Sequence, residues 1–269
     1  MVRELRRVLL DPLRLAAAAT EGRVSLEAAE RHYLRRVLRL RPGQAFGVVD
    51  GRGHLWSAQL AEGARADGAW AVLEQPLAEP LAREPAPWPC LGLAVAPPRR
   101  DTGVLLRMVC ELGIDRLQWL QAERSVAAAE AIRADRQEAV LREALEQCER
   151  LWLPSCLAPE PACGWLAAAP GQGLALLATT RRPGLRSLGA VLQDWAGPTP
   201  PDSVTVAIGP EGGWSPSEER VAEAAGWRPV SLGEGILRSS TAAVAAATRL
   251  AAWREDLPVS CGTSPRPCP

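Results

Sequence analysis

The sequence predicts an α/β protein with a small N-terminal β domain and a larger C-terminal domain built on a parallel sheet. The chain has 269 residues, a length that favours two domains over one. Five prolines crowd residues 76–89, which is typical of a linker. Beyond them, strand-like apolar runs alternate with helix-like segments, and this alternation indicates a mainly parallel sheet covered by helices on both faces.

The N-terminal β domain is expected to cover residues 1–75. A helix is predicted from Ser25, a residue type that suits an N-cap, to Gly43, which stands just past its end. Two strands are predicted on either side of a turn at residues 50–53, and residues 68–75 read as a further strand. These pieces suit a small β-barrel or sheet.

The C-terminal domain is expected to cover residues 90–257, followed by a disordered tail at residues 258–269. Its predicted strands are 90–98, 114–123, 173–180, 203–213 and 228–235. Its predicted helices are 101–113, 134–152, 217–226 and 240–255.

Two glycine-rich turns follow successive predicted strands of this domain. The first, at residues 209–213, leads into a capping box formed by Ser215 and Glu218, and the second, at residues 233–235, leads into an alanine-rich helix. Ligands of open α/β sheets bind at such strand ends, and glycine lets the backbone approach a small molecule closely. The two turns are therefore predicted to form two walls of one pocket, with a purely structural tight turn as the alternative for each.

Composition and motifs argue against several other classes of site. All 31 basic residues are arginine and the net charge is zero, so a uniformly basic nucleic-acid coat is excluded. A P-loop motif is absent, and Arg238 stands where a dinucleotide fingerprint needs its third glycine. Seven cysteines and two histidines lack the spacing of a metal site, so no metal is expected. No membrane span or secretory signal is recognisable, and a cytoplasmic location is expected.

The segments "IGPEGGWSPSEE" and "SLGEGILRSSTAA" resemble the paired signature of SPOUT-class methyltransferases, specifically the RsmE-type enzymes that methylate N3 of a uridine in 16S ribosomal RNA. Three further segments resemble other parts of that family, namely "HYLRRVLRLRPGQAFGVVDGRG", "CELGIDRLQWLQAERS" and "REALEQCERLWLP". The resemblance runs from about Arg6 to Arg254. It implies a PUA-like RNA-binding β-barrel over residues 1–75 and a SPOUT domain with a trefoil-knotted parallel sheet over residues 90–257.

The resemblance also implies S-adenosylmethionine as cofactor, 16S ribosomal RNA or the small ribosomal subunit as partner, no membrane, and a homodimer. Two residues depart from the family pattern, because Ser240 replaces a glutamate and Met108 replaces a lysine. These departures keep two alternatives open. One is a catalytically weakened RNA-binding homologue, and the other is a SPOUT methyltransferase with a different RNA target.

The family signature and the glycine turns together give the candidate site residues. Cofactor binding is expected at Leu177, Gly209, Glu211, Gly212, Gly213, Leu232, Gly233, Ile236, Leu237 and Thr241. Catalysis is expected at Arg238, which is suited to stabilising a uracil anion or holding a phosphate because its guanidinium stays protonated. Glu211 is the second catalytic candidate, as acceptor of the N3 proton or of the cofactor's ammonium group, with stabilisation of its own helix N-terminus as the alternative.

Arginines are the candidates for RNA contact. Arg31, Arg35 and Arg39 recur every four residues and are predicted to form one stripe on a helix. Arg6, Arg7 and Arg124 are expected to extend this phosphate-binding set. The alternative for the stripe is an ordinary solvated helix face.

Overall fold

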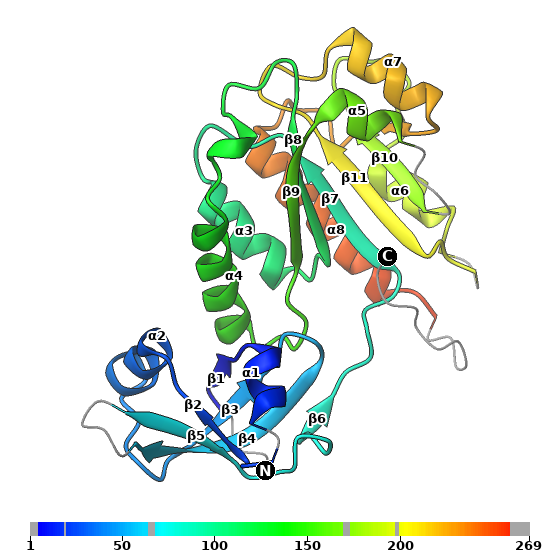
Figure 1. The fold of residues 1–269 in the computed structure, drawn as a ribbon. Coiled ribbons are helices and arrows are strands. Elements are labelled where there is room, and N and C mark those ends of the chain that lie inside the picture. Colours follow the sequence, from blue (N-terminus) through cyan, green and yellow to red (C-terminus); the bar gives the residue numbers. More distant parts are fainter. Residues whose placement is uncertain (1–4, 19, 64–67, 169–172, 197–198, 259–269) are drawn as a thin grey trace. The chain divides into compact units, whose positions relative to one another are not determined.

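The computed structural model describes residues 5–18, 20–63, 68–168, 173–196 and 199–258. The chain divides into two compact units (Figure 1). Unit 1 comprises Met1–Ala86 and Arg142–Leu153, and unit 2 comprises Pro87–Leu141 and Pro154–Pro269. The predicted tail lies, apart from its first residue, outside the described residues. No helix in the described ranges has the length and apolar character needed to cross a bilayer.

Unit 1 is built on a six-stranded sheet with the order β1-β3-β4-β5-β2, in which β6 also pairs with β4. Its strands are β1 (Arg7–Leu9), β2 (Arg23–Ser25), β3 (Ala45–Val49), β4 (His54–Glu62), β5 (Ala69–Leu73) and β6 (Ala82–Arg83). The predicted hairpin of β3 and β4 is confirmed. Its turn is held by the Asp50 carboxylate, which accepts hydrogen bonds from the backbone N–H groups of Arg52 at 2.8 Å and His54 at 3.1 Å.

The predicted helix between residues 25 and 43 is wrong at both ends. Ser25 belongs to β2, where it is paired with Trp70 of β5, and Glu27 forms the N-cap with a capping box to Glu30. Helix α2 (Ala28–His32) continues directly into η1 (Tyr33–Val37), a π-helical turn at which the regular α-helical spacing ends. A short helix α1 (Pro12–Ala17) precedes β2 and begins at the N-cap Asp11.

Two segments that were predicted to lie outside the N-terminal domain belong wholly or partly to unit 1 by their contacts. The predicted linker at residues 76–89 contains β6, whose Ala82 is paired with Leu55 of β4. Helix α4 (Ala134–Cys148) starts in unit 2, but its residues from Arg142 onward belong to unit 1. There the Glu146 carboxylate accepts the Leu9 N–H at 2.9 Å, and the Arg142 guanidinium donates to the Leu9 carbonyl at 2.7 Å. These bonds give the N–H and the carbonyl of Leu9 partners at the edge of the sheet.

Burial raises the pKa of Glu146 from its ordinary value of 4.5 to about 7. Glu146 therefore ionises more readily in the unfolded chain, so the folded state loses stability as the pH rises from about 4.5 to 7. Glu146→Gln keeps an oxygen for Leu9 and removes this loss. We expect the stabilisation of the variant over the wild type, as unfolding free energy, to be larger at pH 8 than at pH 5 by roughly 1–3 kcal/mol.

Urea unfolding at the two pH values measures this gain. The matched control is Glu143→Gln, an exposed position on the same helix, whose charge is the smallest of the causes that raise the Glu146 pKa and which is expected to show a much smaller pH-dependent difference. An equal effect of Glu146→Gln at pH 5 and pH 8 would contradict the prediction.

Unit 2 is built on a sheet of six strands, all paired in parallel, with the order β12-β10-β11-β7-β8-β9. Its strands are β7 (Cys90–Val95), β8 (Arg116–Gln121), β9 (Ser155–Pro161), β10 (Leu174–Ala178), β11 (Ser203–Ile208) and β12 (Arg228–Val230). The prediction of a parallel α/β sheet is confirmed, while the trefoil knot stays a prediction. Strand β9 was missed because it contains Pro159 and Pro161, residues that a sheet tolerates at its edge.

Helices cover both faces of this sheet (Figure 1). They are α3 (Thr102–Glu111), α5 (Ala162–Ala167), α6 (Leu188–Gln193), α7 (Pro216–Ala224) and α8 (Ser239–Glu255), with a short 3-10 turn η2 (Ala129–Ala131). Helices α5 and α7 pack together, while α8 packs on β7 and β11 with α3 and α6 beside it. Strand side chains alternate accordingly, because Ala94 and Ala207 join the α5 and α7 core whereas Leu93 and Val206 do not.

Candidate functional site

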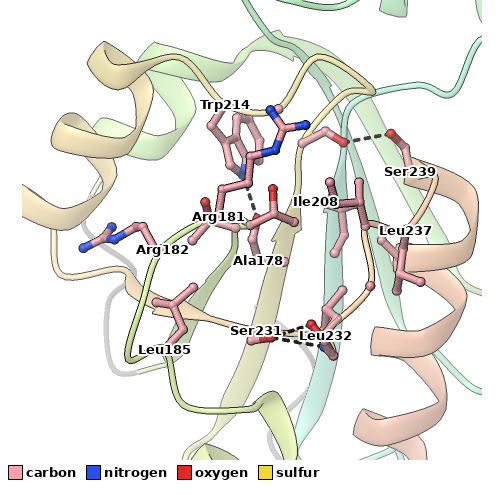
Figure 2. Close-up of a pocket in the computed structure, with 18 of the residues that line it drawn as sticks. Ala178, Arg181, Arg182, Leu185, Ile208, Trp214, Ser231, Leu232, Leu237 and Ser239 are labelled. Carbon is pink, nitrogen blue, oxygen red and sulfur yellow. Dashed lines mark hydrogen bonds between the residues drawn. The ribbon is translucent and has the colours of Figure 1, made fainter.

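A cavity of about 510 Å³ lies at the carboxyl ends of β10, β11 and β12 (Figure 2). Three loops line it, one after each strand, together with the first turn of α8. Both predicted glycine turns are among these loops, so they share one cavity as the sequence predicted. Its place at the carboxyl ends of parallel strands is where open α/β sheets bind ligands.

The loop after β11 is organised around Trp214. Its indole Nε1 donates to the Ala178 carbonyl at 3.0 Å, which ties this loop to the end of β10 (Figure 2). The ring lies so close to Gly209 that a Cβ there would be 3.1 Å from the indole. Gly213 has a φ of +71°, which favours glycine, and its N–H donates to the Pro210 carbonyl at 2.8 Å. The sequence placed this turn correctly but gave Trp214 no role.

The capping box at the start of α7 is confirmed. Ser215 is the N-cap and Pro216 occupies the first turn. The buried Glu218 carboxylate accepts the N–H of Ser215 at 2.8 Å and also that of Glu123 at 2.8 Å. Glu218 therefore fixes the end of the glycine loop against the segment that follows β8.

The loop after β12 is held by its own serine and by α8. The Ser231 hydroxyl bonds to both the N–H and the carbonyl of Gly233, at 3.1 and 2.9 Å. The Arg249 guanidinium donates to the Leu232 carbonyl at 3.0 Å. Buried Ser239, the first residue of α8, donates its hydroxyl to the Gly209 carbonyl at 3.0 Å. This last bond joins the two glycine loops across the cavity.

Ser239→Ala is expected to loosen the connection between the loops, because the Gly209 carbonyl loses its partner. We expect a stability loss of about 1 kcal/mol and a several-fold weaker affinity for a ligand in the cavity. Thermal unfolding and titration calorimetry measure the two effects. Ser240→Ala, one residue further along the helix, is the matched control and should leave ligand affinity unchanged.

Most predicted cofactor-binding residues line the cavity. They are Gly209, Glu211, Gly212, Gly213, Leu232, Gly233, Ile236 and Leu237. Leu177 does not, because its side chain is fully buried in the core beside α5 and α7, and its neighbour Ala178 lines the cavity instead. Thr241 is exposed on α8 and lies outside the lining, whereas Ala242 is part of it.

The two predicted catalytic residues differ in their surroundings. Glu211 is exposed, and its Oε1 accepts the Arg99 N–H at 3.1 Å, so the carboxylate caps the loop after β7 and not its own helix. Arg238 is the exposed N-cap of α8, and its guanidinium has no hydrogen-bond or ion-pair partner among the described residues. Arg238 does not line the cavity, although its neighbours Leu237 and Ser239 do.

The predicted arginine stripe in unit 1 is wrong, because Arg39 lies beyond the helical segment with a φ of +56°. Arg31 donates to the Leu26 carbonyl at 2.8 Å, and Arg35 donates to the Gly68 carbonyl at 3.4 Å. Arg7 pairs with Glu149 at 3.5 Å. Internal contacts thus occupy three of the predicted RNA-binding side chains, while Arg6 and Arg39 are exposed.

Arg124, predicted to bind RNA from unit 2, supports the first glycine loop. Its Nη1 donates to the carbonyls of Gly212 at 3.3 Å and Trp214 at 3.2 Å. A Cβ added at Gly212 would lie 3.0 Å from the Cβ of Arg124. The close approach of these two segments explains why a side chain is absent at position 212.

Residues 86–251 match the family model of an RNA methyltransferase domain, and residues 26–67 match that of an RNA methyltransferase PUA domain. Ribosomal RNA small subunit methyltransferase E of Synechocystis sp. is 38% identical over 241 residues, which cover 88% of this chain and 75% of the relative. The protein of the same name from Mycobacterium tuberculosis is 28% identical, covering 86% and 84%. The crystal structure of a Neisseria gonorrhoeae ribosomal RNA small subunit methyltransferase E bound to S-adenosyl methionine is similar, with a TM-score of 0.75, 27% identity, and coverage of 92% and 97%.

Proposed function

The chain belongs to the RNA methyltransferase family, and on that premise we propose that it transfers a methyl group from S-adenosylmethionine to N3 of a uridine in 16S ribosomal RNA. The observation that carries the proposal is the cavity formed by the two glycine loops, which the Ser239 hydroxyl joins at the Gly209 carbonyl. The named relatives supply the class of substrate, and the chemistry below follows from the residues of this chain.

The cavity suits the proposed cofactor in size and in chemistry. Its volume of about 510 Å³ lies in the range of small-molecule sites. Ile208, Leu232 and Leu237 offer an apolar wall to a purine ring, and the glycine loops present backbone donors and acceptors. S-adenosylmethionine supplies a methyl group on a positively charged sulfur, and the Glu211 and Glu234 carboxylates lining the cavity favour a cationic ligand.

The acceptor places two demands on the protein. Uracil N3 carries a proton that pairs the base in a helix, so the base must be unpaired and that proton must be removed. Glu211 is proposed to accept it, since only its Oε1 is bonded to the Arg99 N–H and its Oε2 has no hydrogen bond from a described residue. Arg238 is proposed to stabilise the resulting negative charge on the uracil carbonyl oxygens.

The two departures from the family pattern lie outside the cavity lining. Met108 is exposed on α3, and Ser240 follows the cavity-lining Ser239 in the first turn of α8. Their positions favour a working enzyme over the catalytically weakened RNA-binding homologue. A SPOUT methyltransferase with a different RNA target remains the second alternative, and it is decided by mapping the product.

We further propose a homodimer that works in the cytoplasm, where ribosomal substrates are found. The support for the homodimer is apolar surface, because Val104 and Met108 are exposed on α3, which packs beside α8. Sedimentation of the purified protein measures the oligomeric state.

The first test is transfer of labelled methyl from S-adenosylmethionine to small ribosomal subunits isolated from cells that lack the modification. Digestion and mapping of the labelled nucleoside follow, with free 16S ribosomal RNA as a parallel substrate. N3-methyluridine at a single position is the expected result. Cofactor binding without transfer would favour the RNA-binding homologue, and a different labelled nucleoside would favour the alternative target.

A further inference from the structure

Three arginines lie close together in the loop between β10 and α6, and they differ in their partners. Arg182 pairs with Glu223 at 2.5 Å, and Arg186 pairs with Asp194 at 2.5 Å. Arg181 is exposed and has no hydrogen-bond or ion-pair partner among the described residues. Its neutralised neighbours leave Arg181 as the guanidinium of this loop that is available to a ligand.

The same contacts fix the backbone that carries Arg181. Thr179 donates its N–H to the Val230 carbonyl at 3.1 Å and its hydroxyl to Glu219 at 2.5 Å. Arg182 anchors the loop to α7, and Arg186 also donates to the Ala190 carbonyl in α6 at 2.9 Å. Because the loop is held at these points, the Arg181 side chain starts from a fixed backbone position, and this limits the conformational entropy lost when a ligand binds.

Arg181 is held in a backbone conformation that its residue type disfavours. Its φ is +60°, in the left-handed region, where a residue with a Cβ costs about 1 kcal/mol compared with glycine. Gly184, three residues later in the same loop, also has a left-handed φ, of +74°, and there the position is occupied by glycine. An arginine kept at a strained position on a cavity wall points to a role for its side chain.

The direction of the side chain is visible in Figure 2. Arg181 extends from the loop toward Trp214, along the wall formed by the first glycine loop, whereas Arg182 points away from the cavity. Both residues belong to the cavity lining. The charge of Arg181 is therefore placed beside the cavity and is exposed to solvent.

We propose that Arg181 is a positioning residue that binds a backbone phosphate of the RNA beside the nucleotide to be methylated. The inference rests on the proposed function and adds a substrate contact in unit 2 to it. A guanidinium matches the paired oxygens of a phosphate, and phosphate contacts fix the register of a nucleic acid on its protein. Arg31, Arg35, Arg7 and Arg124 are engaged internally, and Arg181 supplies a free charge where the base must be held.

The test compares Arg181→Ala with the wild type in methyl transfer to small ribosomal subunits. We expect KM for the subunit to rise about tenfold and the dissociation constant of S-adenosylmethionine, from calorimetry, to change less than about twofold. The slope of log affinity against log salt for RNA should fall by about 0.7, the value for one lost contact to a single strand. Arg181→Lys keeps the charge and should recover the salt slope with part of the affinity.

Two control variants separate this role from a structural one. Arg116→Ala removes an arginine at the amino end of β8, away from the cavity. It should leave KM for the subunit and the dissociation constant of S-adenosylmethionine unchanged. Arg181→Gly relieves the left-handed conformation, so it should unfold at a higher temperature than the wild type while binding RNA as weakly as Arg181→Ala. A gain in stability with a loss of RNA affinity is not expected of a merely structural residue.

Three results would overturn the inference. One is unchanged RNA affinity in Arg181→Ala. Another is RNA affinity that falls equally in Arg181→Ala and Arg116→Ala, which would indicate a general effect of lost charge. The third is weaker cofactor binding with normal RNA affinity, which would assign the guanidinium to the carboxylate of the cofactor. RNA binding is measured by equilibrium titration apart from transfer, so failure of the proposed function appears as a wild-type protein that transfers no methyl group, whatever Arg181 does.

Discussion

Arg238→Ala is expected to lower kcat for methyl transfer by at least about two orders of magnitude, with cofactor affinity within about twofold of the wild type. Arg238 follows the second glycine loop as the N-cap of α8, beside cavity-lining Leu237 and Ser239. Its guanidinium has no described partner to hold it elsewhere. A charge that stabilises a developing uracil anion acts in the transition state, so its loss appears in kcat before it appears in ligand binding.

The fold should tolerate this substitution, because the Arg238 side chain makes no capping bond to α8. Single-turnover transfer with saturating cofactor measures the chemical step, and calorimetry gives the cofactor affinity. Arg220→Ala, which removes an exposed arginine on α7, serves as the matched control. Turnover like that of the control would remove Arg238 from the mechanism.

Gly212→Val is expected to weaken S-adenosylmethionine binding by tenfold to about a hundredfold. A Cβ at position 212 meets the Arg124 Cβ at 3.0 Å and the Arg124 carbonyl oxygen at 3.4 Å, and valine adds two methyl groups to it. The loop must move to make room, and movement breaks the bonds from Arg124 to Gly212 and Trp214. Trp214 is the residue that connects this loop to Ala178.

Calorimetric titration with S-adenosylmethionine measures the effect, and Gly212→Ala should give a smaller loss because it adds only the Cβ. Gly164→Val is the control, since a Cβ at this position on α5 meets nothing within 4 Å. The idea fails if Gly212→Val binds the cofactor as tightly as Gly164→Val does.

Local signals in the sequence predicted the parallel sheet and the two glycine loops. Continuous apolar runs identify strands buried on both faces. The capping box of Ser215 and Glu218, four residues long, marks the start of α7. The bonds that close the cavity carry no such signal. Trp214 reaches Ala178 across 36 positions of the chain, and Glu211 reaches Arg99 across 112. Only the folded chain brings these partners together.

The errors in unit 1 have the same origin. Ser25 suits an N-cap by residue type, but pairing with Trp70 draws it into β2, and Glu27 takes over the cap. The spacing of Arg31 and Arg35 suggested a solvent-facing stripe, yet both side chains find backbone carbonyls. Tertiary contacts decided these positions over local preference.

Helix α4 has a consequence for how the protein is made. Arg142 and Glu146 satisfy the N–H and the carbonyl of Leu9 at the edge of β1, so these two backbone groups have no such partners while only the first 86 residues exist. During synthesis, this N-terminal part must wait until more than fifty further residues have emerged from the ribosome, although domains commonly fold in order from the N-terminus. A fragment ending at Ala86 would keep that strand edge open and should aggregate.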